Sequence, residues 1–467
     1  MPCLYCPRLF TDAGGTPAAL TWHFPCLELL WHAPFFRNRN SRIMYNIQFE
    51  ASSMKYVIFL GDGMADYPIA ELGGKTPLMV AQKPGMDWIA REGRTGLFQT
   101  IATDMMTGSA IANLSVLGYD AKAIFHGTEG RGVLEAASLG VDLGKNDVAL
   151  RVNLISVESV KWGGDEKIRS HSAGHISNEE ARELIRDAGD HFKSWPLRLY
   201  PGLSYRHVLI VAGGEFRLES FPPHDNVGTP WRDLAIRPIE PASSAGKETA
   251  GLLNRFVDES RKFLENHPVN IRRRADGKQP ANLLWPWAPG KKPEMQTVEE
   301  RFGVKGAAIT AVDLIKGLAI YAGMKPIDVY GATGLYDTNF EGKADAALAA
   351  LEEADFVYIH VEAADEAGHE KNLSLKIRCI EDLDRRLIQR VIEGTREKGW
   401  DCVFAVLPDH TTPIAIGNHG REPVPVAIRF PNVSGDAVER YDEESVKSGS
   451  LGLMTGSQFI ETFFQKM

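Results

Sequence analysis

The 467-residue sequence has few cysteines, no long hydrophobic run and no excess of positive charge. Its five cysteines are too few and too scattered for a disulfide framework, which favours a reducing, cytoplasmic setting. No run approaches the roughly 20 apolar residues of a membrane helix. The formal net charge of −9 offers no basic surface to nucleic acid or to an anionic membrane, so neither is expected as a partner. If the substrate is an anion, the positive charge that binds it must therefore come from a few local arginines or from bound metal.

The first 53 residues differ from the rest because they show no steady helical or strand period. We expect residues 1–53 to be unstructured or an over-extended start, with Met54 as the functional beginning. A docking or targeting arm is the alternative. Short apolar runs after this leader alternate with helical stretches such as 375–392, which predicts an α/β fold with a mainly parallel sheet flanked by helices.

In the middle of the chain the alternation of strand and helix patterns is less regular, and the sequence is rich in proline and tryptophan. We therefore expect residues 120–299 to form an inserted domain. Residues 54–119 and 300–467 are expected to form the core that receives it. No oligomeric state is predicted from the sequence.

Three predicted strands, 56–60, 357–361 and 403–407, are each followed by an aspartate, and two of them also by a histidine. Because the carboxyl ends of parallel strands meet at one edge of a sheet, these side chains are expected to lie together. The candidate ligands are Asp62, Asp365, His369, Asp409, His410 and, in a later glycine turn, His419. Each alone is more often a cap or a surface residue. Together, carboxylates and imidazoles in this ratio are typical of sites for Zn²⁺, Mn²⁺ or a similar divalent ion.

Ser109 is the candidate nucleophile. It follows a glycine and opens the helical segment 111–117, a position where backbone N–H groups favour a phosphate. A serine there is more commonly a helix cap. Next to a metal, its hydroxyl would lose a proton readily and could accept a phosphoryl group.

Several stretches resemble the archaeal type of cofactor-independent phosphoglycerate mutase, a family within the alkaline phosphatase superfamily. They are Lys55–Pro68, Gly108–Tyr119, Gly306–Gly317, Gly331–Lys343, Val361–His369 and Pro408–Pro413, and they span nearly all of the chain after the leader. The resemblance implies an alkaline-phosphatase-like core that carries an inserted α/β domain of the phosphotransferase type.

The resemblance also implies roles for the residues. One ion would be held by Asp62, Ser109, Asp409 and His410, and a second by Asp365, His369 and His419. The two divalent ions are expected to be Mn²⁺, with Zn²⁺, Co²⁺ or Mg²⁺ as alternatives. The implied reaction of glycolysis and gluconeogenesis interconverts 3-phosphoglycerate and 2-phosphoglycerate through a phosphoserine at Ser109.

A mutase must also hold the glycerate while its phosphoryl group is on the enzyme, which calls for arginines on the carboxylate. The candidate residues for this small phosphorylated hydroxy acid are Arg131, Arg151, His175, Arg206 and Lys316. The sequence departs from the family pattern at Ala110, where aspartate is usual, and around Arg131, where Val133 stands near the usual proline.

Three alternatives stay open. A branch of this family is labelled as putative homoserine kinases, but the sequence has no phosphate-binding loop of the usual nucleotide-binding types. A small-molecule phosphomonoesterase would need the same metal cluster and serine. A relative that binds metal or a partner without turnover would have no need of Ser109.

Overall fold

The computed structural model describes residues 54–125, 130–159 and 165–465. The predictions for residues 1–53 lie outside these ranges, so the leader stays a prediction. No helix in the described ranges is long and apolar enough to cross a membrane.

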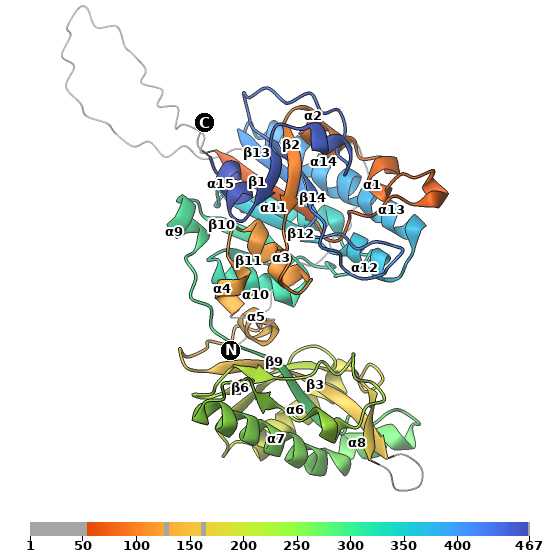
Figure 1. Cartoon of the computed structure of the whole chain (residues 1–467), viewed down its shortest axis with the longest axis vertical. Helices are drawn as coiled ribbons and strands as arrows, with labels where there is room; N and C mark the ends of the chain where they lie inside the picture. Colours follow the sequence, from red (N-terminus) through yellow and green to blue (C-terminus); the bar gives the residue numbers. More distant parts are fainter. Residues whose placement is uncertain (1–53, 126–129, 160–164, 466–467) are drawn as a thin grey trace, which may run out of the picture. The chain divides into compact units, whose positions relative to one another are not determined.

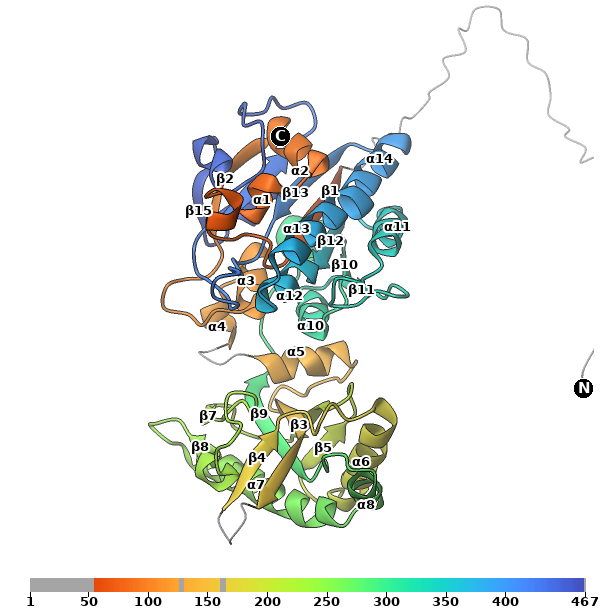
Figure 2. The same ribbon diagram turned by 90° about the vertical axis from the view of Figure 1, so that its right-hand side faces the viewer.

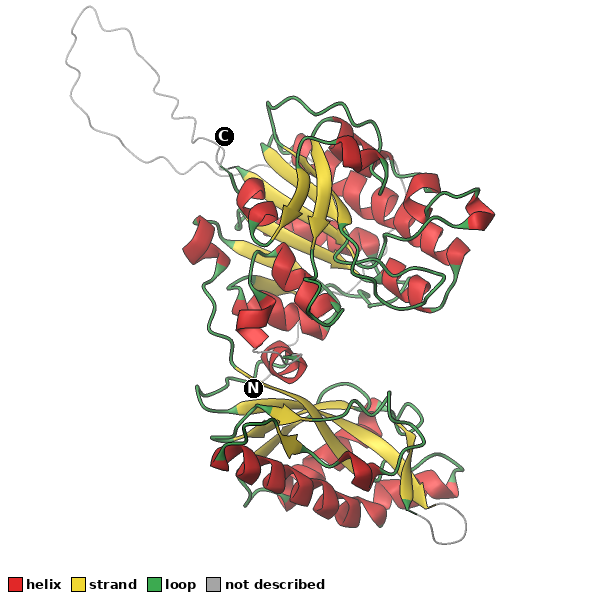
Figure 3. Cartoon of the chain, in the orientation of Figure 1, coloured by secondary structure: helices red, strands yellow, loops and turns green. Residues whose placement is uncertain are grey.

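The larger sheet has eight strands in the order β11-β10-β12-β1-β13-β14-β2-β15. Its strands are β1 (Lys55–Gly61), β2 (Arg94–Gln99), β10 (Gly306–Ile309), β11 (Lys325–Ile327), β12 (Phe356–Val361), β13 (Cys402–Leu407), β14 (Val424–Arg429) and β15 (Gly452–Thr455). The five strands from β11 to β13 are parallel, and β14 is antiparallel to both of its neighbours. The prediction of a mainly parallel sheet is confirmed (Figures 1 and 3).

Both faces of this sheet are buried, because alternate residues of β1 enter two different apolar cores. Tyr56 and Ile58 pack on one face, and Val57 and Phe59 pack on the other. The helices of the first face are α3 (Ser109–Val116), α4 (Ala121–Phe125), α10 (Asp313–Tyr321) and α15 (Gln458–Phe463). Those of the second face are α1 (Pro77–Val80), α2 (Pro84–Arg91), α11 (Phe340–Ala350), α12 (Ala363–His369), α13 (Leu373–Asp382) and α14 (Gln389–Glu397). Helices therefore flank the sheet on both sides, as predicted (Figure 2).

The helix predicted over 375–392 is also present. Its apolar period is carried by α13, a π-helical turn at Leu383–Ile388 and α14, which follow one another without a break. The buried side of this run includes Ile380, Leu387 and Ile388. A short helix α9 (Val298–Phe302) precedes β10.

The smaller sheet has the order β4-β3-β6-β5, with β9 paired to β3. Its strands are β3 (Val148–Ser159), β4 (Glu166–Ser170), β5 (Leu197–Tyr200), β6 (Arg206–Val211) and β9 (Leu283–Lys291), and all pairs are antiparallel. A two-stranded ribbon of β7 (Leu218–Glu219) and β8 (Arg237–Pro238) accompanies it. One face packs on α6 (Asn178–His191), α7 (Ser244–Glu265) and α8 (Pro268–Ala275).

Helix α5 (Arg131–Ser138) joins the two sheets through its packing. Val133 and Leu134 share an apolar core with Val208 of β6 and with Ile315 of α10. A Cβ on Gly317 would lie 1.9 Å from the carbonyl oxygen of Leu134, so the approach of α10 to α5 requires glycine. Arg131, the first residue of α5, is thereby held close to the larger sheet.

Candidate active site

The three strand ends named from the sequence are neighbours in the larger sheet, because β1 lies between β12 and β13. Gly61 pairs with Val361 and Leu60 pairs with Leu407, so the three loops leave the sheet at nearly the same level. This register brings Asp62, Asp365 in the first turn of α12, and Asp409 to one edge. All three carboxylates are buried.

His410 lies at the centre of the first group of side chains. Its Nε2 atom is 3.5 Å from Asp62 Oδ1 and 3.5 Å from Asp409 Oδ2. The same nitrogen is 3.3 Å from the hydroxyl oxygen of Ser109. Ser109 is the first residue of α3, so the helix start and two strand ends meet at one point. The four residues of the first expected ligand set therefore lie together.

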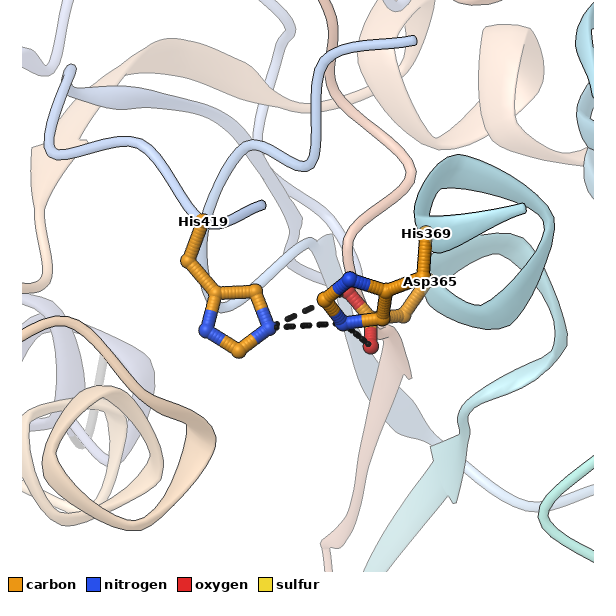
Figure 4. A group of neighbouring side chains, drawn as sticks. All are labelled: Asp365, His369 and His419. Atoms are coloured by element: carbon orange, nitrogen blue, oxygen red, sulfur yellow. Dashed lines mark hydrogen bonds and ion pairs between the residues drawn. The ribbon is translucent and has the colours of Figure 1, made fainter. Parts of the chain in front are cut away.

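Asp365, His369 and His419 form the second group (Figure 4). His369 Nε2 lies 3.0 Å from Asp365 Oδ2 and 3.0 Å from His419 Nε2. His369 Nδ1 lies 3.1 Å from the carbonyl oxygen of Gly417 and donates to it, which leaves Nε2 as the atom that faces the group. A histidine oriented by a carbonyl in this way is usual at metal sites.

The charges of this edge fit divalent cations. Burial and the neighbouring Asp409 and Asp365 raise the pKa of Asp62 well above its usual value. Asp62 Oδ1 is buried and has no hydrogen-bond partner among the described residues. The side-chain hydrogen bond to Asp365 raises the pKa of His369 to about 9. The His369 imidazole is therefore protonated at neutral pH when no metal ion is bound. Buried carboxylates this close, with one oxygen unsatisfied, are stabilised by bound metal.

Sequence reasoning missed the side chains that orient these groups. His360 lies inside β12, and its Nε2 is 3.0 Å from Asp62 Oδ2. Burial lowers the pKa of His360 to about 4, so it donates as a neutral imidazole. A histidine in an otherwise apolar strand, two positions before the loop, was the available signal.

Asn113 is a second missed residue, one turn after Ser109 in α3. Its amide nitrogen donates to the Ser109 carbonyl at 2.8 Å and to Asp409 Oδ2 at 2.9 Å. Its amide oxygen accepts a hydrogen bond from the hydroxyl of Tyr358 in β12. These three contacts fix the amide orientation, and they tie the serine helix to an aspartate of the cluster.

A cavity of about 580 Å³ opens beside the cluster. Ser109, Asp365, His369 and His419 line one side of it, and Arg131, Arg151 and Arg206 line another. The arginines come from α5, β3 and β6. The cavity thus combines a serine, a metal-type cluster and three guanidinium groups.

Two other residues predicted for the substrate lie elsewhere. Neither His175 nor Lys316 is among the described residues that line this cavity. Lys316 Nζ lies 2.7 Å from Asp328 Oδ1. His175 lies in a cluster of aromatic rings in which its ring centre is 6.5 Å from that of His171 and 6.3 Å from that of Tyr205.

Comparison with known proteins yields one consistent family. A family model described as 2,3-bisphosphoglycerate-independent phosphoglycerate mutase matches residues 90–270. A protein of that name from Methanosarcina acetivorans is 47% identical over 410 residues, which are 87% of this chain and 98% of the relative. The chain belongs to the cofactor-independent phosphoglycerate mutase family, archaeal type. A probable enzyme of the same name from Geobacter sulfurreducens is 43% identical over 88% of this chain and 100% of its own.

Solved structures agree with this assignment. The cofactor-independent phosphoglycerate mutase of Thermoplasma acidophilum aligns with a TM-score of 0.60 and 27% identity, over 87% of this chain and 98% of its own. A Pyrococcus horikoshii protein aligns with a TM-score of 0.73 and 30% identity, over 89% and 99% of the two chains. The family resemblance drawn from the sequence is confirmed. The prediction that the protein is an enzyme, and not a relative that only binds metal or a partner, is also confirmed. The mutase interpretation is favoured over the homoserine kinase and phosphomonoesterase alternatives.

Proposed function

We propose that the protein interconverts 3-phosphoglycerate and 2-phosphoglycerate, and that Ser109 carries the phosphoryl group between the two positions. The observation that carries this proposal is the Ser109 hydroxyl, which lies 3.3 Å from His410 Nε2 in the carboxylate-imidazole cluster and lines the arginine cavity. A serine placed between such a cluster and an anion-binding wall suits transfer of a phosphoryl group from a carboxylated substrate.

Two divalent ions, Mn²⁺ in our assignment, would be held by the two groups of side chains. Asp62, Ser109, Asp409 and His410 would hold one, and the other would be held by Asp365, His369 and His419. When bound, such ions supply positive charge that stabilises the oxygens of a transferring phosphoryl group. Zn²⁺, Co²⁺ and Mg²⁺ accept the same ligand types.

The reaction proceeds in two displacements at phosphorus. In the first, a bond forms between Ser109 Oγ and phosphorus while the bond from phosphorus to the glycerate 3-oxygen breaks. The proton lost by the Ser109 hydroxyl ends on the freed glycerate 3-oxygen. In the second, phosphorus bonds to the glycerate 2-oxygen while its bond to Ser109 Oγ breaks, and the proton of the 2-hydroxyl returns to Ser109. Binding of the glycerate carboxylate by Arg131, Arg151 and Arg206 keeps the glycerate in place and disfavours water as the acceptor. His175 and Lys316 would serve this role only after a rearrangement that brings them to the cavity.

This function implies a division of the chain and a setting. Residues 54–119 and 300–467 would form the phosphatase-like core, and residues 120–299 would form the inserted substrate domain. The positions of the two sheets in the sequence support this division. We propose a cytoplasmic enzyme that uses a small phosphorylated hydroxy acid and no nucleic acid.

One assay tests the proposal. Purified protein is given 3-phosphoglycerate with Mn²⁺, and both 2-phosphoglycerate and free phosphate are followed. We expect 2-phosphoglycerate to form with little free phosphate. Free phosphate as the main product would identify a phosphomonoesterase, and ATP-dependent phosphorylation of homoserine without mutase activity would identify the kinase.

A further inference from the structure

The side of the cavity formed by Arg131, Arg151 and Arg206 is called the arginine wall. It contains one carboxylate, that of Glu135, which the proposed reaction does not require. Glu135 lies one turn after Arg131 on α5, and its Oε1 is 3.0 Å from Arg151 Nη1. Both side chains are nearly buried, with 14% of Glu135 and 8% of Arg151 exposed. Glu135, Arg131, Arg151 and Arg206 all line the same cavity. An anion of the protein thus occupies part of the surface that would receive the anion of the substrate.

Glu135 and Trp287 together fix the guanidinium of Arg151. The guanidinium carbon lies 5.2 Å from the ring centre of Trp287, and the indole N–H of that residue donates to Asn153 Oδ1 at 3.0 Å. Arg151 Nε is nevertheless buried without a hydrogen-bond partner among the described residues. This nitrogen is not presented to the cavity. Arg151 nevertheless lines the cavity, and its ion pair with Glu135 neutralises part of the guanidinium charge there.

The electrostatics of Glu135 are set by its position. Burial raises the pKa of Glu135, and the charges of Arg151, Arg131 and Arg206 act in the opposite direction. Among Arg131, Arg151, Arg206 and Glu135, three guanidinium groups and one carboxylate leave two positive charges in excess. The nearby Asp313 carboxylate adds to the rise in the pKa of Glu135. A second negative charge brought beside Glu135 would meet a buried carboxylate at short range, where repulsion is strong.

We propose that Glu135 is a specificity-determining residue that limits the arginine wall to ligands with a single carboxylate at that end. It holds Arg151 in place and reduces the positive charge of the wall. A monocarboxylate such as glycerate is then accepted, and a dicarboxylate of similar size is rejected. This inference rests on the proposed function for its substrate, but the selectivity for charge is measured by binding alone.

The test compares two probes, D-glycerate with one carboxylate and hydroxymalonate with two. Calorimetry measures both dissociation constants on the full chain with Mn²⁺, and because neither probe carries a phosphoryl group, no turnover occurs. In Glu135→Gln we expect the selectivity ratio to move toward hydroxymalonate by about tenfold or more relative to the parent. An unchanged ratio overturns the proposal.

Asp313→Asn is the matched control, because Asp313 lines the same cavity and its carboxylate accepts a hydrogen bond from Ser138 rather than from an arginine. A shift as large as that of Glu135→Gln would show a general charge effect and would also overturn the proposal. Glu135→Asp retains the charge and must keep the parental preference for glycerate, which makes the test independent of a fold defect in Glu135→Gln. A parent that binds glycerate selectively but lacks mutase activity would sink the proposed function and leave this inference standing.

Discussion

The two sides of the cavity are built by different means. On the cluster side, Asp62 and Asp409 lie in the loops after β1 and β13, and Asp365 lies in the first turn of the helix after β12. The register of these three neighbouring strands therefore sets the level at which the aspartates meet. On the arginine side, Arg131 and Arg151 come from a helix and from a second sheet, and an ion pair with Glu135 holds the wall in place. The cluster is thus positioned by backbone pairing within one sheet, whereas the arginine side is positioned by side-chain pairing between separate elements.

The largest effect is expected on the cluster side from Ser109→Ala. Removing the hydroxyl removes the phosphoryl acceptor and leaves the fold intact, so we expect kcat to fall by about 10³-fold or more. Steady-state formation of 2-phosphoglycerate measures the loss. Ser115→Ala is a matched control, because Ser115 is in the same helix and donates to the carbonyl of Ile111 at 3.2 Å. Equal activity of parent and Ser109→Ala would contradict the covalent route.

A change on the arginine side is expected to act on binding more than on chemistry. Arg151→Leu should raise KM for 3-phosphoglycerate by about 100-fold, because a charge-assisted contact is lost and Glu135 is left unpaired. The fraction of turnovers that release free phosphate should also rise. Arg198→Leu serves as the control, since Arg198 is 55% exposed on the same sheet and pairs with Asp147. A fall in kcat without any change in KM would contradict the assignment of substrate binding to the arginine side.

A smaller effect is expected from the link between the serine helix and the cluster. Asn113→Leu removes the donors to Asp409 and to the Ser109 carbonyl, and we expect kcat to fall by about 10-fold to 100-fold with little change in KM. Tyr358→Phe removes only the hydroxyl that orients the amide and should cost less. Parallel losses of kcat and thermal stability in both variants would indicate a purely structural role for Asn113.

The smallest effect on catalysis is expected from an acid of the cluster side that lies away from the ligands. Glu443 accepts hydrogen bonds from the Asp66 N–H at 3.0 Å and from the Thr76 hydroxyl at 2.6 Å. Burial raises the pKa of Glu443 to about 7 from 4.5. The folded state therefore holds this proton more tightly, and the associated stability is present below about pH 4.5 and is lost as the pH rises through 7.

Denaturant unfolding at several pH values measures this contribution, which we expect to be about 3 kcal/mol. Glu443→Gln should remove that part of the pH dependence while leaving mutase activity nearly unchanged. The same pH profile in parent and variant would assign the dependence to other groups.

The sequence predicts the cluster side better than the arginine side, and the reason is physical. Aspartates placed just after buried parallel strands must meet at one sheet edge, so Asp62, Asp365 and Asp409 could be grouped without a structure. His360 was missed because a histidine in a buried strand signals a polar contact but does not identify the partner. Asn113 was missed because its contacts to Asp409 and Tyr358 depend on how α3 packs against the sheet.

The arginine side depends on packing between elements far apart in sequence. Arg131 and Glu135 are one helical turn apart, which resembles an ordinary surface pair until α5 is seen against β3. Lys316 was chosen by resemblance, and its ion pair with Asp328 could not be foreseen from spacing. The mainly parallel sheet followed from alternating strand and helix patterns. The partners of individual side chains across the two sheets did not.

The most direct test of the account is rapid acid quench of the enzyme during turnover of 3-phosphoglycerate with Mn²⁺, followed by peptide mass spectrometry. We predict one phosphoryl group on Ser109, present with substrate and absent without it. Phosphate on another residue under these conditions, or an unmodified Ser109 throughout the time course of turnover, would contradict it.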